Sequence, residues 1–529
     1  MNLATPLAGQ AARRPDHPAI LFEGRTISYG ELDAQSSRLA HAMRARGIEA
    51  GDRVALFLPN VPEFAVVYYA AQRIGAVPVS INAIFRSAEV EYLVNDSGAR
   101  VVFTMPDLAG FVVRERCPSL EYVVVVDGPS VAPAGAPAPA SAASAAPVAS
   151  PADGSAGSAA GTEPLSAWIE GRPERFEPVE RAPDDPAALL YSSGTTGFPK
   201  GVTLTQSNIA SNIASAAKYS GYRPDDRLAT FLPLFHVYGQ NYILNAAILS
   251  GATVSLFRRF VPDQVLRAIE HDRITMFFGV PTIFIGLLSM DLGPYDLSSI
   301  RYEMSAAATM PEEVSRRWTE RFGRRVYEGY GLTECSPFAC YNDLVEHRFG
   351  SVGRAVEGFE LAIFDEEDRE QPRGEWGEIV IRGPGVMKGY WNRPEDTERA
   401  LRGGWLHSGD IGRMDEDGYV YIVDRVKDMI NVSGFKVWPA EVEQYLYRMP
   451  QVQELAVYGV PHPEKGEQVA VAVVPKAGQS LDAEQVIAWC RESIAAYKVP
   501  AIVDIVDELP KSPTGKILKR VLREQAVKG

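Results

Sequence analysis

A segment at residues 191–201, with the sequence YSSGTTGFPKG, has the composition of a phosphate-binding loop. Its glycines let backbone N–H groups converge on an anion, its hydroxyl side chains add donors, and Lys200 adds a positive charge. The order of residues differs from GxxxxGK[ST], which excludes the common nucleoside triphosphatase loop. A stretch rich in glycine and hydroxyl residues is often an ordinary surface loop. Apolar, strand-like runs at residues 187–191 and 201–205 flank this one, and they favour a loop held between two strands.

Four further blocks follow in the chain: YGLTE at residues 330–334, WLHSGD at 405–410, DRVKDMI at 424–430 and PKSPTGK at 510–516. Together with the loop, and in this order, they resemble the conserved blocks of the adenylate-forming superfamily. That superfamily includes acyl-CoA synthetases, adenylation domains of peptide synthetases and beetle luciferases. The resemblance extends over most of the chain, and it implies an enzyme that uses ATP to activate a carboxylic acid.

The resemblance also implies an α/β fold in two parts. A large layered N-terminal domain with a distorted β-barrel is expected over residues 1–423, and a small, mobile α+β domain over residues 428–529. Residues 424–427 would form the hinge, with Lys427 as its pivot. Short apolar runs alternating with helical patterns agree with α/β layering. Residues 128–161 are almost entirely Ala, Pro, Ser and Gly, which predicts a flexible surface insertion.

The resemblance assigns roles at a nucleotide site. Tyr330 would lie against the adenine and Thr333 at the α-phosphate, while Asp410 would accept hydrogen bonds from the ribose hydroxyls with Arg425 beside it. Thr195 and Glu334 would bind Mg²⁺, for which carboxylate oxygen is a suitable ligand beside phosphates. In the expected adenine wall, Ala306 stands where the family usually has glycine. The predicted ATP- and AMP-binding residues are Ser192, Ser193, Gly194, Thr195, Thr196, Gly197, Lys200, Ala306, Ala307, Ala308, Glu328, Gly329, Tyr330, Gly331, Thr333, Asp410, Arg425 and Lys516.

The resemblance gives Lys516 the role of the lysine that reaches the carboxylate and the α-phosphate during adenylation. His236 either orients the carboxylate or gates the acyl tunnel, although a histidine in an apolar run is commonly an ordinary core residue. Ser433 and Gly434 would line the route of the thiol after the C-terminal domain rotates, and His407 is expected to be structural. The predicted catalytic residues are Thr195, Lys200, His236, Glu334 and Lys516, and the predicted acyl pocket comprises His236, Val237, Gln240, Gly279 and Val280.

Composition limits the partners. With 529 residues, 46% of them hydrophobic, the chain can bury a large core. A formal charge of -14 argues against a surface for nucleic acid or anionic membrane, so the positive charge that anionic substrates need must be local. We expect Lys200, Arg425 and Lys516 to supply it by converging. The four cysteines form no C-x-x-C pair and are expected to be reduced; no signal or membrane-spanning segment is visible, so a cytoplasmic location is expected.

The leading hypothesis is an ATP-dependent acid–thiol ligase that uses Mg²⁺ and transfers the acyl group to coenzyme A. Residues 239–244 and 277–284, which line the acyl pocket in relatives, contain no charged side chain, and this favours a medium- or long-chain fatty acid. An aromatic acid would also suit these segments. The alternatives that remain are a fatty acyl-AMP ligase that loads an acyl carrier protein, a luciferase-like monooxygenase and a non-catalytic nucleotide-binding protein. An amino acid is disfavoured because His236 occupies the place where amino-acid-activating relatives usually have aspartate.

Overall fold

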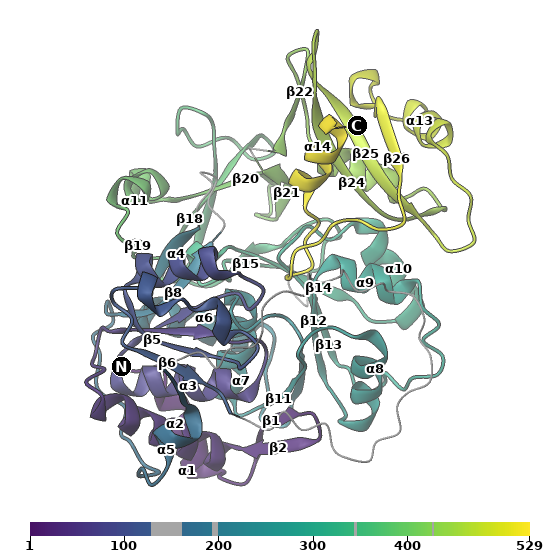
Figure 1. The fold of residues 1–529 in the computed structure, drawn as a ribbon. Helices are drawn as coiled ribbons and strands as arrows, with labels where there is room; N and C mark the ends of the chain where they lie inside the picture. Colours follow the sequence, from purple (N-terminus) through teal and green to yellow (C-terminus); the bar gives the residue numbers. More distant parts are fainter. Residues whose placement is uncertain (128–160, 193–198, 343–345, 426–427, 529) are drawn as a thin grey trace.

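The computed structural model describes residues 1–127, 161–192, 199–342, 346–425 and 428–528 (Figure 1). Within these residues the chain has a mixed α/β fold with a large N-terminal domain and a smaller C-terminal domain, which confirms the predicted fold class. All of the predicted insertion except Gly161, and the predicted pivot Lys427, lie outside the described residues. Among the described residues, no helix has the length and apolar character needed to cross a membrane.

The first sheet of the N-terminal domain carries the predicted phosphate loop between two of its strands. It runs in the order β19-β9-β8-β4-β3-β5-β6-β7 and is mostly parallel. Its strands are β3 (Arg53–Phe57), β4 (Val77–Ser80), β5 (Ala99–Thr104), β6 (Tyr122–Val125), β7 (Thr162–Pro164), β8 (Pro186–Ser192), β9 (Lys200–Thr205) and β19 (Gly389–Tyr390). The helices in this part of the chain are α2 (Tyr29–Ala45), α3 (Pro62–Ile74), α4 (Ser87–Ser97) and α5 (Leu165–Ile169), with 3₁₀ turns η1 (Ala109–Phe111) and η2 (Arg114–Arg116).

The second sheet ends at the predicted adenine and acyl segments, and its order is β16-β15-β14-β13-β12-β10-β11-β1-β2. Its strands are β1 (Pro18–Phe22), β2 (Arg25–Ser28), β10 (Arg227–Thr230), β11 (Thr253–Leu256), β12 (Met276–Gly279), β13 (Tyr302–Ser305), β14 (Val326–Tyr330), β15 (Cys340–Tyr341) and β16 (Arg354–Ala355). The helices are α1 (Thr5–Arg13), α6 (Gln206–Tyr219), the π-helix η3 (Tyr238–Asn245), α7 (Ala246–Ser250), α8 (Pro262–His271), α9 (Pro281–Leu288), α10 (Glu312–Phe322) and the 3₁₀ turn η4 (Thr333–Cys335). Strands β10 to β14 are parallel, so their carboxyl ends meet at one edge.

A four-stranded antiparallel sheet, in the order β17-β18-β20-β21, occupies the part of the chain before the predicted hinge. Its strands are β17 (Glu360–Phe364), β18 (Trp376–Arg382), β20 (Leu406–Met414) and β21 (Val420–Arg425), with α11 (Pro394–Ala400) and η5 (Arg402–Gly404) between β19 and β20. An isolated bridge from Gly353 to Val420 joins this sheet to the segment that precedes it.

The C-terminal part contains a sheet of β22 (Ile430–Val432), β23 (Phe435–Val437), β24 (Val452–His462), β25 (Gly466–Pro475) and β26 (Ile502–Ile505), with α12 (Pro439–Leu446), α13 (Ala483–Arg491), η7 (Ala496–Lys498) and α14 (Lys519–Lys528). Figure 1 shows this part above α9, α10 and the ends of β12 and β14. The Thr282 hydroxyl donates to the carbonyl of Gly515 at 3.0 Å, and the backbone N–H of Glu312 donates to Gln444 at 2.9 Å. The C-terminal sheet is therefore docked over the edge at which the candidate site lies.

Candidate active site

The predicted phosphate loop connects two antiparallel strands, as its flanking residues indicated. Ser192, the last residue of β8, is the register partner of Lys200, the first residue of β9. At the end of β9, Thr205 caps α6 through a capping box with Asn208, which fixes the hairpin to the helix behind it. Ser193, Gly194, Thr195, Thr196 and Gly197 lie outside the described residues.

Lys200 and Glu334 approach one another through Tyr390. The Nζ atom of Lys200 lies 3.0 Å from Asp396 Oδ1 and 5.3 Å from the centre of the Tyr390 ring. The Tyr390 hydroxyl donates to Glu334 Oε1 at 3.0 Å, and the Ser192 hydroxyl donates to the same oxygen at 3.0 Å. The buried carboxylate of Glu334, oriented by two hydroxyl donors, is a suitable ligand for a metal ion. This cluster therefore combines an anion-binding lysine, Lys200, with a potential metal ligand.

The residues predicted to bind ribose form a second cluster. Asp410 and Arg425 are register partners on β20 and β21, and Arg425 Nε lies 3.1 Å from Asp410 Oδ1. The Tyr330 hydroxyl donates to Asp410 Oδ2 at 2.8 Å. A carboxylate has about four lone-pair positions, so Asp410 retains capacity for two further donors, such as a pair of ribose hydroxyls.

The predicted adenine wall follows β13. Ala306 and Ala307 are half-buried and Ala308 is exposed. The left-handed conformation, with φ of 72°, falls on Ala307 rather than on Ala306, where the family usually has glycine. This conformation disfavours a side chain, so Ala307 is the strained position of the wall.

Two predicted glycines in and after β14 fill places that admit no side chain. A Cβ atom on Gly331 would lie 1.5 Å from the carbonyl oxygen of Pro337, and one on Gly329 would lie 2.3 Å from Met304. Thr333 is half-buried at the start of η4. Glu328 is buried, and burial raises the pKa of its carboxyl well above the usual range. Its Oε1 atom has no hydrogen-bond partner among the described residues, and its contact with the nucleotide stays a prediction.

The predicted acyl pocket adjoins the docked C-terminal loop. Val237, Gln240 and Val280 are buried, and a Cβ atom on Gly279 would lie 2.8 Å from the Phe284 ring. Gly515, at the tip of the loop that carries Lys516, has φ of 78°, and a Cβ atom there would lie 2.8 Å from Val280. The loop therefore fits against the segment after β12 only because residue 515 is glycine.

His236 and Lys516 lie within electrostatic reach of each other in this arrangement. Burial, with a smaller contribution from Lys516, lowers the pKa of His236 to about 3. The backbone N–H of Tyr238 donates to His236 Nδ1 at 3.2 Å, which assigns the proton of the neutral ring to Nε2. His236 can thus offer an uncharged N–H donor to a carboxylate while Lys516 brings the positive charge.

Sequence comparisons identify the family to which the chain belongs. Residues 7–391 match the family described as AMP-binding enzyme, and residues 441–516 match the AMP-binding enzyme C-terminal domain. The chain belongs to the AMP-binding enzyme family. It is a member of the adenylate-forming superfamily in its acyl-CoA synthetase branch, as the sequence blocks indicated, with ATP and coenzyme A as co-substrates.

Relatives of this adenylate-forming enzyme differ in the acid they use. The chain is 36% identical to a long-chain-fatty-acid–CoA ligase of Bacillus subtilis (strain 168), covering 99% of this chain and 94% of the relative. It is also 36% identical to a feruloyl-CoA synthase of Amycolatopsis sp, covering 98% and 97%. Among solved structures, the anthranilate CoA ligase AuaEII in complex with anthranoyl-AMP has a TM-score of 0.89 at 28% identity, covering 99% and 97%. ATP-bound MatB from Rhodopseudomonas palustris has a TM-score of 0.87 at 33% identity, covering 99% of each chain.

The residues of this adenylate-forming enzyme fit Mg²⁺, the metal ion that the family implies. Mg²⁺ is usually bound by one or two carboxylates together with substrate phosphates, and Glu334 supplies a carboxylate close to Lys200 and to the end of β8. Arg425 lies within electrostatic reach of both Asp410 and Glu334. The charge of Asp410, with a smaller contribution from Glu334, raises the pKa of Arg425. Lys200 thus lies near Glu334 through Tyr390, and Arg425 lies within electrostatic reach of Glu334, while the convergence of both with Lys516 stays a prediction.

Sequence reasoning missed Tyr390 and Asp396. Tyr390 belongs to β19, which pairs with β9 at Val202, and Asp396 lies on the helix that follows. Nothing in the local sequence distinguishes them, because their role depends on a strand pairing between distant segments. The run of Gly389, Tyr390 and Trp391 is the one signal that could have drawn attention to this strand.

Ser433 and Gly434 belong to the sheet of the C-terminal part. They form the exposed turn between β22 and β23, with φ values of 52° and 89°. Their assignment to a thiol route remains a prediction, and it requires the C-terminal domain to rotate.

The low pKa of His236 predicts a pH-dependent stability. Between pH 6.5 and about 3 the unfolded chain would bind a proton at His236 that the folded chain does not, so stability falls as pH falls, by about 1.4 kcal/mol per pH unit. From pH 7 to pH 5, the free energy of unfolding of the wild type should decrease by about 2 kcal/mol more than that of His236→Gln. Chemical denaturation at the two pH values measures this difference.

His271→Gln, at an exposed position, controls for the loss of an imidazole elsewhere. If the wild type and His236→Gln lose the same stability between pH 7 and pH 5, His236 titrates normally in the folded protein.

Proposed function

We propose that this enzyme activates a medium- or long-chain fatty acid as its acyl-adenylate and transfers the acyl group to coenzyme A. In the first half-reaction a carboxylate oxygen attacks the α-phosphorus of ATP and pyrophosphate leaves. In the second, the thiol attacks the acyl carbonyl, AMP leaves and the thiol proton is released. The observation that carries the proposal is that Lys516 lies within electrostatic reach of His236, on a loop bound through Gly515 to Thr282 beside the predicted acyl pocket.

Each of these residues has a separate task in the first half-reaction. The Nε2–H of His236 orients the incoming carboxylate, and the ammonium of Lys516 offsets the repulsion between that carboxylate and the α-phosphate. Asp410 holds the ribose, and Lys200 with the loop before β9 holds the outer phosphates. Mg²⁺ on Glu334 would neutralise the charge that develops on pyrophosphate.

The apolar wall supports a fatty acid. Val237, Ile243, Phe277, Phe278 and Val280 are all buried. The Phe277 ring contacts Phe231 and the Phe278 ring contacts Tyr242, which lie before and after His236 in the chain. A charged group on the far end of the acid would lose its hydration there without gaining a partner. The Bacillus subtilis relative, a long-chain-fatty-acid–CoA ligase, supports the same class of acid.

An aryl acid is the second candidate, and the ring packing supports it. The Tyr242 ring lies 5.5 Å from the Tyr238 ring and 5.0 Å from the Phe338 ring, in edge-to-face contacts. Such walls suit a flat aromatic acid. The feruloyl-CoA synthase and the anthranilate CoA ligase are relatives with aromatic acids in their names. An acyl carrier protein is a further candidate acceptor beside coenzyme A.

A series of straight-chain acids separates the two candidates. Each buried methylene contributes about 0.8 kcal/mol, nearly fourfold in affinity, until the pocket ends. We therefore expect kcat/KM, measured by ATP–pyrophosphate exchange, to rise from four carbons to at least eight. A flat profile, or a maximum with benzoate or cinnamate, would reject the fatty acid. Transfer assays with coenzyme A and with an acyl carrier protein identify the acceptor.

A further inference from the structure

The carboxylate of Asp410 sits at the end of a bulge in strand β20. Glu378 on β18 pairs with Ile411, but Val380, two residues later, pairs with His407. Ile379 therefore lies opposite three residues, Ser408, Gly409 and Asp410. Bulges of this kind re-aim side chains next to active sites. Gly409 has φ of 71°, the left-handed conformation that glycine adopts without strain.

A bulge leaves backbone groups without ladder partners, and the side chains of this sheet satisfy them. The backbone N–H of Gly409 donates to Glu378 Oε1 at 2.8 Å. The Ser408 hydroxyl donates to the carbonyl of Ile379 at 2.6 Å and accepts the N–H of Asp410 at 3.0 Å. These three backbone contacts of the bulge thus depend on side chains of β18 and β20, and Glu378 binds its central residue, Gly409.

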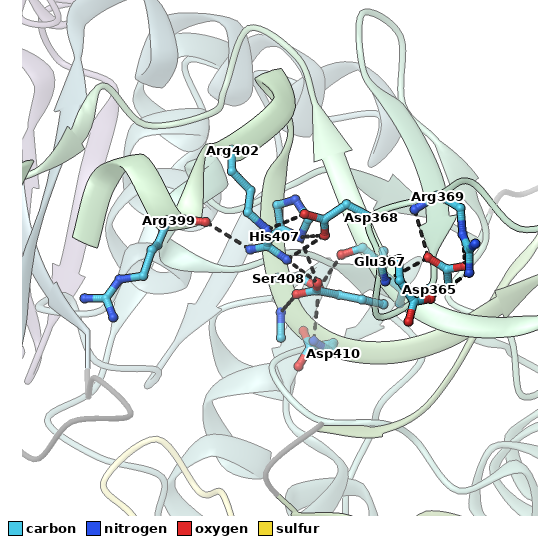
Figure 2. Close-up of polar contacts among 12 residues, drawn as sticks. Asp365, Glu367, Asp368, Arg369, Arg399, Arg402, His407, Ser408 and Asp410 are labelled. Carbon is cyan, nitrogen blue, oxygen red and sulfur yellow. Dashed lines mark hydrogen bonds and ion pairs between the residues drawn. The ribbon is translucent and has the colours of Figure 1, made fainter. Parts of the chain in front are cut away.

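The second oxygen of Glu378 is also fixed. His407 Nδ1 lies 2.8 Å from Glu378 Oε2, and the side chain of His407 is only 4% exposed. Arg402 binds Asp368 through two contacts of 2.9 Å and reaches Glu378 Oε2 at 3.5 Å. Figure 2 shows Arg402 and Asp368 above and beside His407, with Ser408 and Asp410 below it. The Glu378 carboxylate therefore has little freedom to move away from the bulge.

We propose that Glu378, held by His407, is a positioning residue for ribose recognition: it keeps the bulge at residues 408–410 in the shape that aims Asp410 at the ribose hydroxyls. The proposal rests on the assignment of Asp410 to the ribose in the proposed function. It gives His407, expected from the sequence to be merely structural, a defined task within the nucleotide site.

The test compares the binding of ATP and of 3′-deoxy-ATP by calorimetry without the acid. A hydrogen bond to a charged group should make the wild type prefer ATP by about tenfold or more. In Glu378→Ala this preference should fall to within about threefold, because ATP binding weakens and 3′-deoxy-ATP binding changes little. Glu378→Gln should retain most of the preference for ATP. The amide oxygen can accept the Gly409 N–H, and the amide nitrogen can donate to Nδ1 of His407 when the His407 ring carries its proton on Nε2.

Glu360→Ala is the matched control, because Glu360 is also paired with an arginine, Arg382 of the neighbouring strand, but is exposed. It should keep the full preference. If Glu378→Ala does not fold, Glu378→Asp retains the charge but draws the oxygens back from the bulge, and it should also lose preference. A preference that is lost in Asp410→Ala but retained in Glu378→Ala, or in the folded Glu378→Asp, overturns this proposal alone. A wild type without preference overturns the ribose role of Asp410 and this proposal with it.

Discussion

Replacing Lys516 with alanine should lower the rate of adenylation by about 10² to 10³ while sparing thioester formation from a supplied acyl-adenylate. The lysine lies on a loop whose tip, Gly515, is bound to Thr282, and its charge reaches His236. Only the first half-reaction brings two anions together, so only that step needs this charge. ATP–pyrophosphate exchange measures the first half-reaction, and release of AMP from synthetic acyl-adenylate in the presence of coenzyme A measures the second.

Lys218→Ala provides the control, since Lys218 is an exposed lysine paired with Glu357 on the surface. It should leave both half-reactions unchanged. Equal losses of the two half-reactions in Lys516→Ala would contradict the assignment of this lysine to adenylation.

Replacing Glu334 with glutamine should lower the rate of adenylation about as much as Lys516→Ala does, because it weakens the binding of Mg²⁺. The amide oxygen can still accept the hydroxyls of Ser192 and Tyr390, so the local packing should persist. The lost negative charge weakens the binding of Mg²⁺ between the protein and the phosphates. We expect adenylation to fall by about 10² to 10³ and the Mg²⁺ concentration for half-maximal rate to rise, measured by pyrophosphate exchange over a magnesium titration.

The exposed Glu492→Gln is a suitable control for the removal of a surface charge. A small rate change with an unaltered magnesium requirement would show that Glu334 does not bind the metal.

The sequence was sufficient to predict features that depend on neighbouring residues. The apolar runs around the loop predicted strands on both sides of it, and the family resemblance of the 405–410 and 424–430 blocks implied that Asp410 and Arg425 serve one site. The structure places these two residues in register on adjacent strands. The apolar runs carry their own strand preference, so the conformation of β8 and β9 follows from local composition, whereas the pairing of Asp410 with Arg425 was implied only by the family.

Features that depend on distant pairing could not be predicted. Tyr390 reaches Lys200 and Glu334 only because β19 pairs with β9, and the bulge of β20 depends on Glu378 in a different strand. Ser408 and Gly409 suggest a turn by composition, but no local pattern states which carboxylate will accept the N–H of Gly409. The position of the left-handed residue at Ala307 likewise follows from the path of the chain after β13 and not from its alanines.

Because Gly515 lies against Val280, the same residue borders both the predicted acyl pocket and the loop that carries Lys516. Val280 belongs to the predicted acyl pocket, and the loop that delivers Lys516 closes on the same residue. A substitution of Val280 that changes the shape of the pocket to admit a different acid would also change the surface against which Gly515 packs. We therefore expect substitutions of Val280 that change the choice of acid also to change the position of Lys516 and the rate of adenylation, whereas substitutions in η3 should leave the contact with Gly515 unchanged.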